Sequence, residues 1–223
     1  MTTASHNADL PTDLADLRAR LDTVDTGIHR LLRERFEIVE AIGASKGPVD
    51  AIIRPAREAA VIENRLALHK GAMPPEMLAH IWRVLISAAC TIQRPFKVHT
   101  CGALDAALFL YGAISATTHA TPDAAVMALR DGDVAVLAEE GAWWNALGDG
   151  AAHVIGRVRT SVGPSCVIVG GAGVSRGTGP EAVVLRGGVA QFMAANDVSG
   201  DDELLGRFHP FPIPVPVSEA SSE

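Results

Sequence analysis

The chain lacks the features that mark several large classes of protein. Its three cysteines, Cys90, Cys101 and Cys166, form no CxxC pair, which argues against a disulfide framework and favours reduced thiols in a cytoplasmic protein. The eight histidines are scattered without the spacing of metal ligands, so we expect no metal site. The chain contains no run of about 18 apolar residues and begins without a basic-plus-apolar signal, so no membrane association is expected.

The composition that remains is that of a soluble globular protein. Hydrophobic residues make up 48% of the 223 residues, which is enough for a core in one or two domains. Residues 1–96 hold 12 basic and 12 acidic residues, whereas residues 97–223 hold 7 and 14. The acidic second half argues against a nucleic-acid partner or an anionic membrane, and the change in composition near Pro95 predicts a domain boundary there.

The first half shows helical periodicity. Apolar residues spaced by three or four run from Leu14 to Ile42, which predicts one helix of about 33 residues with Thr12 as its N-cap. Further helices are expected from Pro55 to Lys70 and from Pro75 to Gln93, each opened by proline. A first helix of about 50 Å cannot bury its apolar stripe against two shorter helices alone. We therefore expect it to pair with a second copy of the chain.

Polar residues interrupt these helices where apolar ones are expected. Arg35 lies on the apolar stripe of the first helix, and a buried cation is costly unless an anion pairs with it. At about 100° per residue, Lys46 falls within about 20° of the face of Arg35, whereas Arg18 lies about 100° away from it. The pair Arg57-Glu58 and Gln93 complete the set. A small organic dianion would account for such a group of cations.

Three stretches of sequence resemble the chorismate mutase family of the all-helical type, over residues 12–96. They are LRARLDTVDTGIHRLLRERFEIVEAIGASK, RPAREAAVI and IWRVLISAACTIQRPF. The resemblance implies that residues 1–96 form an all-α domain of three helices, with a long first helix and an intertwined dimer. It also implies the conversion of chorismate to prephenate, without a cofactor.

The resemblance further implies roles for the three arginines of the set. Arg35 and Arg57 would hold the carboxylates of the substrate. Arg18 would reach into the active site of the partner subunit, as antiparallel packing of two long helices allows. The active sites of the homodimer would then be shared between the two chains.

The remaining members of the set are expected to act on the reacting part of the substrate. By the same resemblance, Lys46 and Gln93 would hydrogen-bond the ether oxygen whose bond breaks, and Glu58 would accept a hydrogen bond from the ring hydroxyl. The rearrangement is unimolecular and needs neither a nucleophile nor a proton transfer. Catalysis would consist of orienting the dianion and of placing donors where negative charge grows.

Two positions depart from the family pattern. Arg54 stands where many members have an acidic residue near the ether-oxygen lysine, and Ala89 stands where a hydroxyl-bearing residue often contacts a carboxylate. The first removes a partner of Lys46, and the second removes a hydrogen bond to the substrate.

The second half of the chain alternates short β-rich runs with helical ones, which predicts an α/β domain at residues 97–223. We expect strands at 97–101, 134–138, 166–170 and 182–185, and helices at 104–114 and 123–130. The glycines between Gly170 and Gly177 lack GxGxxG spacing and predict a loop between strands rather than a nucleotide site. Trp143-Trp144 is expected to anchor packing.

Residues 97–205 resemble prephenate dehydratase more faintly, in the order of elements and in the segment ATPDAAVMALRDGDVAVLAEE. The loop that begins at Glu139-Glu140 lacks the expected asparagine and serine. The nearest text to the dehydratase's threonine motif is Arg159-Thr160-Ser161. We therefore expect an α/β domain without dehydratase activity.

The prediction for the chain is thus a cytoplasmic, dimeric chorismate mutase with an α/β appendage. Isochorismate-pyruvate lyase and 4-amino-4-deoxychorismate mutase stay open as alternatives, although the Glu58 carboxylate suits chorismate's ring hydroxyl and favours the mutase. A sensor that binds chorismate without converting it is the alternative from another class.

Overall fold

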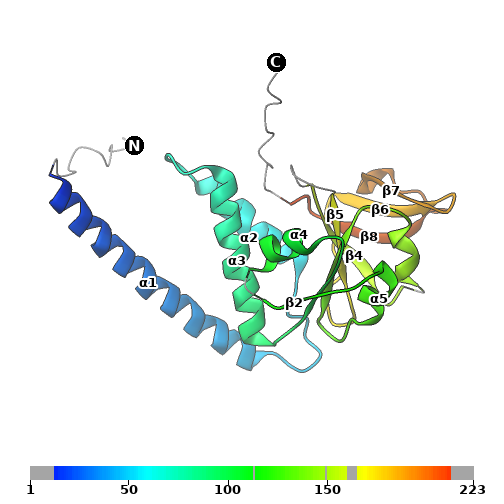
Figure 1. Ribbon diagram of the computed structural model, residues 1–223, viewed down its shortest axis with the longest axis horizontal. Helices are drawn as coiled ribbons and strands as arrows, with labels where there is room; N and C mark the ends of the chain where they lie inside the picture. Colours follow the sequence, from blue (N-terminus) through cyan, green and yellow to red (C-terminus); the bar gives the residue numbers. More distant parts are fainter. Residues whose placement is uncertain (1–12, 113, 149, 160–164, 212–223) are drawn as a thin grey trace, which may run out of the picture. The chain divides into compact units, whose positions relative to one another are not determined.

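The computed structural model describes residues 13–112, 114–148, 150–159 and 165–211 (Figure 1). By their contacts these residues fall into two compact units that divide after Ser45. Unit 1 is helix α1, and unit 2 begins at Lys46. The packing therefore does not divide at residue 96, where the composition changes; a boundary there stays a prediction from the sequence.

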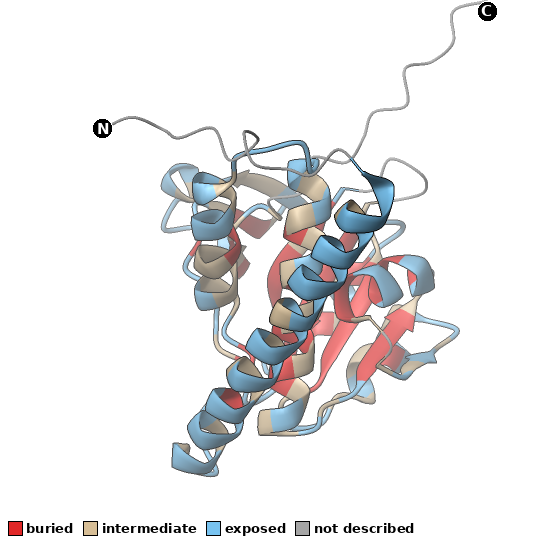
Figure 2. Cartoon of the chain, turned by 90° about the vertical axis from the view of Figure 1, so that its left-hand side faces the viewer, coloured by how far each residue is buried: buried red, intermediate tan, exposed pale blue. Residues whose placement is uncertain are grey.

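Helix α1 of unit 1 spans Leu14–Ser45, 32 residues in all. Asp13 precedes it, and the Asp13 carboxylate accepts hydrogen bonds from the backbone N–H groups of Ala15 (2.9 Å) and Asp16 (3.3 Å), as an N-cap does. Thr12, the predicted cap, lies outside the described residues. Val39 is the only buried residue of α1, and Figure 2 shows the helix exposed along most of its length.

Unit 2 begins with two helices, α2 (Pro55–Leu68) and α3 (Pro75–Gln93). Each has proline in its first turn, where the missing N–H has no intrahelical partner to lose. Helix α2 ends two residues before the predicted Lys70, because His69 is already extended. Helix α3 ends at Gln93, where the extended Arg94 precedes Pro95.

The rest of unit 2 is an eight-stranded sheet with short helical segments. In chain order the elements are β1 (Val98–Cys101), α4 (Leu104–Tyr111), β2 (Ala116–Thr118), α5 (Pro122–Met127), β3 (Val134–Ala138), η1 (Trp143–Leu147), β4 (His153–Val158), β5 (Cys166–Gly170), β6 (Glu181–Arg186), β7 (Val189–Ala194), η2 (Ala195–Asp197) and β8 (Glu203–Phe208).

The strands lie in the order β2-β1-β3-β5-β4-β8-β6-β7. The first three are parallel, with β1 between β2 and β3, and β5 then pairs antiparallel with both β3 and β4. The parallel pairing of β4 with β8 brings Gly206 opposite Val154. A Cβ at Gly206 would lie 2.1 Å from the carbonyl oxygen of Val154, so this approach requires glycine.

Both faces of the sheet are buried, and side chains alternate between two cores with the period of a strand. Val134 and Val136 of β3 belong to one core, whereas Ala135 and Leu137 belong to the other. The first core also contains residues of α2, α3 and α4, and the second contains Ala125 of α5. Helices α2 and α3 thus share a hydrophobic core with the sheet.

The α/β part holds the elements predicted for it, along with four strands that were not predicted. Strands β1, β3, β5 and β6 lie at or within a residue of the expected stretches, whereas β2, β4, β7 and β8 were missed. Helix α4 ends before the predicted residue 114 because Gly112 adopts a positive φ of 70°. The glycine-rich stretch links β5 to β6 as a loop, and Trp143 is buried in the second core, as predicted.

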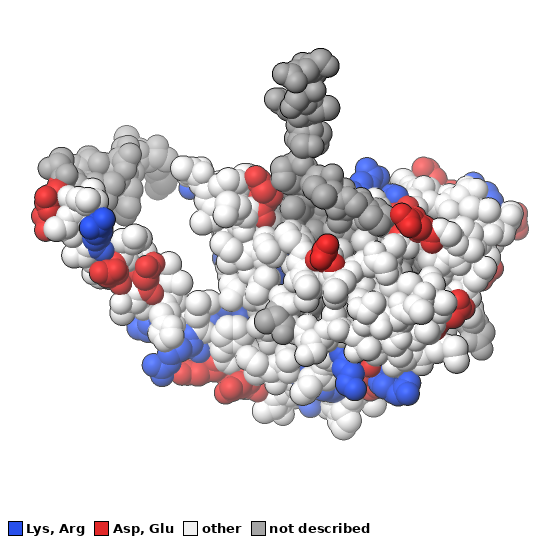
Figure 3. Space-filling model, in the orientation of Figure 1, with Lys and Arg blue, Asp and Glu red and all other residues white. Residues whose placement is uncertain are grey.

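Two features of the described surface bear on partners. On the face shown in Figure 3, acidic and basic side chains are interspersed over unit 2 rather than gathered into one basic patch. No helix in the described part of the chain combines the length and the apolar character that crossing a membrane would require.

Candidate active site

Two of the six predicted site residues, Arg18 and Arg35, lie on α1. Arg18 is exposed, and Arg35 is half-buried with its guanidinium carbon 5.3 Å from the centre of the Phe36 ring. Arg33, two residues earlier, is exposed and lies 4.0 Å from Glu37. Arg35 is therefore less exposed to solvent than Arg33 on the same helix.

The first residue of unit 2 is Lys46, and its ammonium group lies among other cations. Lys46 Nζ donates a hydrogen bond to the carbonyl oxygen of Ala51 (3.4 Å), and Arg94 Nη2 donates one to the carbonyl oxygen of Gly47 (3.2 Å). These bonds tie the segment between α1 and α2 to the end of α3. Burial, and then the charges of Arg54 and Arg94, lower the pKa of Lys46 below its ordinary value.

Arg54 thus acts on Lys46 in the opposite sense to the acidic residue found in many chorismate mutases. A carboxylate there would raise the pKa of Lys46, whereas this guanidinium lowers it. The departure noted in the sequence therefore has an electrostatic consequence at the proposed site.

Gln93, the last residue of α3, is partly tied down. Its Nε2 donates to the carbonyl oxygen of Ala89 (3.1 Å), while its Oε1 is buried and has no hydrogen-bond partner among the described residues. An amide nitrogen carries two hydrogens, so one hydrogen remains for a ligand. Because the buried amide oxygen accepts no hydrogen bond from the described residues, the free-energy cost of removing it from water is not offset.

Arg57 and Glu58 are neighbours in the chain but point into different surroundings. Arg57 is exposed. The carboxylate of Glu58 accepts hydrogen bonds from the backbone N–H of Arg54 (2.9 Å) and from Nη1 of Arg83 (2.7 Å). The two partners of this ion pair, Glu58 and Arg83, have side chains only 11% and 10% exposed.

Arg83 was missed by the sequence analysis. Burial is the largest single influence and would lower the pKa of Arg83, but the charge and hydrogen bond of Glu58, together with Tyr111 and Cys90, outweigh it and hold the pKa above its ordinary value. Arg83 lies between Ala79 and Ile86 on the buried stripe of α3. The argument that singled out Arg35, a cation at a position where an apolar stripe calls for an aliphatic residue, would also have found Arg83.

Within unit 2, the structure places Lys46 near the C-terminal end of α3, which carries Gln93, and places Glu58 in a separate buried contact with Arg83. Among the described residues no group of three histidine, cysteine, aspartate or glutamate side chains is arranged to hold a metal ion.

Comparison with known protein families finds a match for the segment that contains α1, α2 and α3. The model of the family described as chorismate mutase type II matches residues 17–94. Residues 17–94 are therefore similar to chorismate mutase type II domains over about a third of the chain. This segment contains all six predicted site residues, from Arg18 to Gln93, and the resemblance seen in the sequence is confirmed over this range.

Curated relatives of this domain carry it within longer proteins. The chain is 40% identical over 81 residues to a protein of Neisseria gonorrhoeae named bifunctional chorismate mutase/prephenate dehydratase, covering 36% of this chain and 22% of that protein. Proteins of the same name from Aquifex aeolicus and Pseudomonas aeruginosa are 37% and 30% identical over 91 residues, covering 39% and 38% of this chain and 25% of each relative. The match therefore spans about a quarter of these relatives. No solved structure matches the chain significantly.

The loop that we compared with the dehydratase is held by an ion pair. Glu139, which follows β3, accepts a hydrogen bond from Nε of Arg157 on β4 at 2.7 Å, and the Arg157 guanidinium carbon lies 3.8 Å from the centre of the Phe192 ring. The nearby Thr160-Ser161 lies outside the described residues.

Proposed function

We propose that this protein is a chorismate mutase that rearranges chorismate to prephenate. The observation that carries the proposal is the family match, because residues 17–94 include every member of the polar set. The domain needs no cofactor for such a reaction, since orientation of a dianion and stabilisation of developing charge supply the catalysis.

The proposed roles follow the polar set. Arg35 and Arg57 bind the substrate carboxylates, and Lys46 and Gln93 donate hydrogen bonds to the ether oxygen as negative charge builds on it. Glu58 accepts the hydrogen bond of the ring hydroxyl. Since the Glu58 carboxylate already accepts from Arg83 and from the N–H of Arg54, it would have to use a remaining lone pair.

We further propose that two copies of the chain form the active sites, with Arg18 supplied by the partner. The support is the apolar stripe of α1, whose members are 45–58% exposed: Leu14, Leu21, Val24, Ile28, Leu31, Ile38 and Ile42. Full burial of such a side chain is worth about 1.5–3 kcal/mol, and about half of each is still exposed, so a second copy that covered the stripe would gain about half of that free energy at each of the seven positions.

Mixing of variants tests this sharing. Homodimers of Arg18→Ala and of Arg35→Ala should each be nearly inactive, whereas co-refolded mixtures should regain activity, because one site of every mixed dimer keeps both arginines. The measurement is chorismate turnover together with mass spectrometry of the mixed dimer. If mixed dimers form and no activity returns, the sites are not shared in this way.

For the α/β part we propose a role other than prephenate dehydration, because its loop at Glu139-Glu140 lacks the polar residues that the resemblance calls for. Purified protein incubated with prephenate should yield no phenylpyruvate. Formation of phenylpyruvate at a rate above that of the buffer would overturn this proposal. The cytoplasmic location stays a prediction.

The decisive test of the main proposal is to incubate the full chain with chorismate and, separately, with isochorismate. We expect loss of chorismate and appearance of prephenate, identified by mass spectrometry. Salicylate and pyruvate from isochorismate would instead indicate the lyase, and saturable binding of chorismate without turnover would indicate a sensor.

A further inference from the structure

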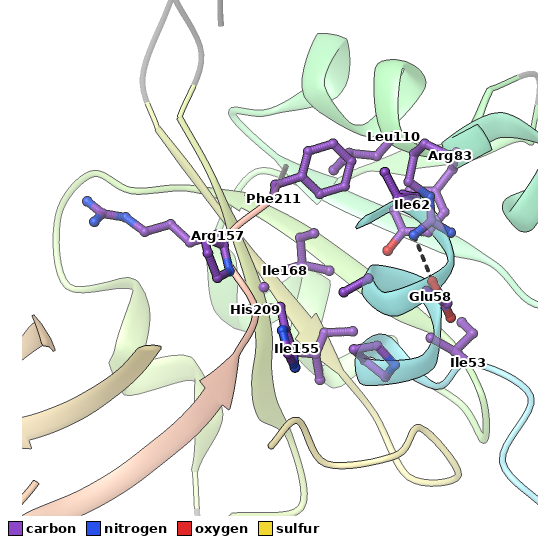
Figure 4. Close-up of a pocket in the computed structure, with 15 residues that line it drawn as sticks. Ile53, Glu58, Ile62, Arg83, Leu110, Ile155, Arg157, Ile168, His209 and Phe211 are labelled. Carbon is purple, nitrogen blue, oxygen red and sulfur yellow. Dashed lines mark hydrogen bonds and ion pairs between the residues drawn. The ribbon is translucent and has the colours of Figure 1, made fainter. Parts of the chain in front are cut away.

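A small cavity lies inside unit 2; of the predicted site residues in this unit, Glu58 lines it, whereas Lys46 and Gln93 do not. It is bordered by α2, α3 and α4 on one side and by β4, β5 and the residues after β8 on the other. Figure 4 shows the side chains of these elements converging on it. Its volume is about 50 Å³, which at roughly 10–15 Å³ per water leaves room for three to five water-sized groups.

The walls of the cavity are mainly apolar. The large apolar side chains that line it include Ile53, Ile62, Leu110, Ile155, Ile168 and Phe211, and the ring of Tyr111 lies beside them. Such walls favour the apolar body of a ligand over water, because apolar surface gains free energy when it leaves water.

One buried cation in the lining retains unused donors. Arg83 uses Nη1 to bind Glu58, but its Nε is buried and has no hydrogen-bond partner among the described residues. A guanidinium presents its N–H groups as a fork that matches the two oxygens of a carboxylate. A buried N–H without an acceptor is costly, so a ligand acceptor at this edge would remove a penalty.

Glu58 does not cancel this preference for an anion. Its carboxylate also accepts from the backbone N–H of Arg54 at the start of α2, where the helix dipole is positive. Part of the negative charge is thus compensated by the helix, and Arg83 is left with the capacity to bind a second carboxylate.

Two other polar side chains in the lining, Arg157 and His209, have partners elsewhere. Arg157 pairs with Glu139 and lies over the Phe192 ring, and Figure 4 shows its side chain directed away from the cavity. His209 Nδ1 lies 3.7 Å from a carboxylate oxygen of Glu63. Arg83 is therefore the group best placed to bind the carboxylate of a ligand.

We propose that this cavity is a binding site for a small carboxylic acid with a short apolar body, whose carboxylate pairs with Arg83 and whose body packs against the aliphatic walls. The size of the cavity, about three to five water-sized groups, selects acids of two or three carbons, and acetate and propionate are the matching probes.

The test is a titration of the full chain with acetate, propionate and propionamide, followed by calorimetry and by ligand-observed NMR. We expect the two acids to bind in the millimolar range and the amide to bind at least tenfold more weakly. Equal binding of propionamide and propionate would overturn the proposal, and so would the absence of binding by folded protein.

Variants locate the site independently of Arg83. Ala59 of α2 lines the cavity, whereas its neighbour Ala60, also half-buried, does not. Ala59→Leu should fill the cavity and weaken propionate binding at least tenfold, while Ala60→Leu should leave propionate binding unchanged. Arg83→Met should abolish the preference for the acid over the amide. Unchanged binding in folded Ala59→Leu would show that the acid binds elsewhere.

The titration does not depend on the proposed function, because it measures binding and not turnover. A protein that binds propionate but leaves chorismate unchanged would contradict the mutase proposal alone. A protein that converts chorismate but binds no small acid would contradict the cavity proposal alone.

Discussion

Helix α1 and the sheet of unit 2 are both rich in aliphatic side chains, but they differ in what covers them. The apolar stripe of α1 is about half exposed from Leu14 to Ile42, whereas Val134 and Val136 of β3 are fully buried. The sheet is covered by helices on one face and by α5 and η1 on the other. Helix α1 therefore has an exposed apolar stripe along most of its length, whereas the strands in the middle of the sheet have none.

The difference separates two sources of helix stability. Isolated helices are marginal in water and gain most of their stability from packing of an apolar face. Helices α2 and α3 obtain this packing from the sheet of their own chain, through a shared core that includes Ile62 and Ile86. Helix α1, with Val39 as its one buried residue, requires a surface outside itself.

Truncating the chain should have the largest effect on folding, and it tests whether α2 and α3 depend on the sheet for their packing. Residues 46–223 contain the whole of unit 2 and should unfold cooperatively, whereas residues 1–96 should fail to fold, because they lose the sheet that buries Ile62 and Ile86. Far-UV circular dichroism and thermal unfolding of both pieces provide the measurement.

A well-folded 1–96 piece would show instead that the boundary predicted from composition also divides the packing. In that case α1 of a second copy would have to replace the sheet over α2 and α3. Sedimentation of the piece would distinguish this outcome, since it requires a dimer.

Breaking the buried ion pair should have the next largest effect. Arg83→Ala leaves the Glu58 carboxylate buried without its cation, which typically costs about 3–5 kcal/mol of unfolding free energy. Removing both charges in Arg83→Met/Glu58→Gln should cost less than Arg83→Ala alone. Urea unfolding with an unchanged slope provides the measurement.

The exposed pair Arg33–Glu37 of α1 is the matched control. Because both side chains are about 70% exposed, Arg33→Ala should barely change stability. Equal losses from Arg83→Ala and Arg33→Ala would mean that burial does not distinguish the two units as we describe.

The same exposed arginine, Arg33, is also the control for the proposed role of Arg35 in the active site. Arg35→Ala should lower chorismate turnover by about 10²–10³-fold, the range that one preorganised donor typically supplies, without loss of helix content. Arg33→Ala should keep nearly full activity. Steady-state kinetics of the two variants test the assignment, and near-normal turnover in Arg35→Ala would refute it.

The sequence predicted those parts of the fold that depend on local periodicity and on glycine or proline. The bounds of α3 follow from Pro75 and Pro95, and β3 and β5 follow from apolar runs of five residues between turns. Strands β7 and β8 were missed because they are only partly buried and lack a continuous apolar run. Pairing between strands distant in sequence, such as β4 with β8, leaves no local signal.

The candidate site was predictable to the same extent. Residues that break an apolar stripe, such as Arg35, can be recognised by spacing alone, and Arg83 follows the same rule although it was overlooked. The partner of Glu58 could not be found in this way, because residues 58 and 83 lie on different helices and only the packing of α2 against α3 brings them together.

The smallest expected effect is a shift in the pH dependence of kcat/KM, which we assign to Lys46. Lys46 must be protonated to donate a hydrogen bond to the ether oxygen, and burial together with Arg54 and Arg94 lowers its pKa below the ordinary 10.5. The proton is therefore lost as pH rises through this lowered pKa, so kcat/KM for chorismate should fall at a lower pH than a solvent-exposed lysine would give. Arg54→Ala removes one of the two cations and should shift this alkaline decline to higher pH. Arg186 lies on β6, and its charge does not contribute to the pKa shift of Lys46. Arg186→Ala should therefore leave the alkaline decline at the same pH. A pH profile that is identical in Arg54→Ala and the unaltered protein would show that Lys46 does not set the alkaline limit.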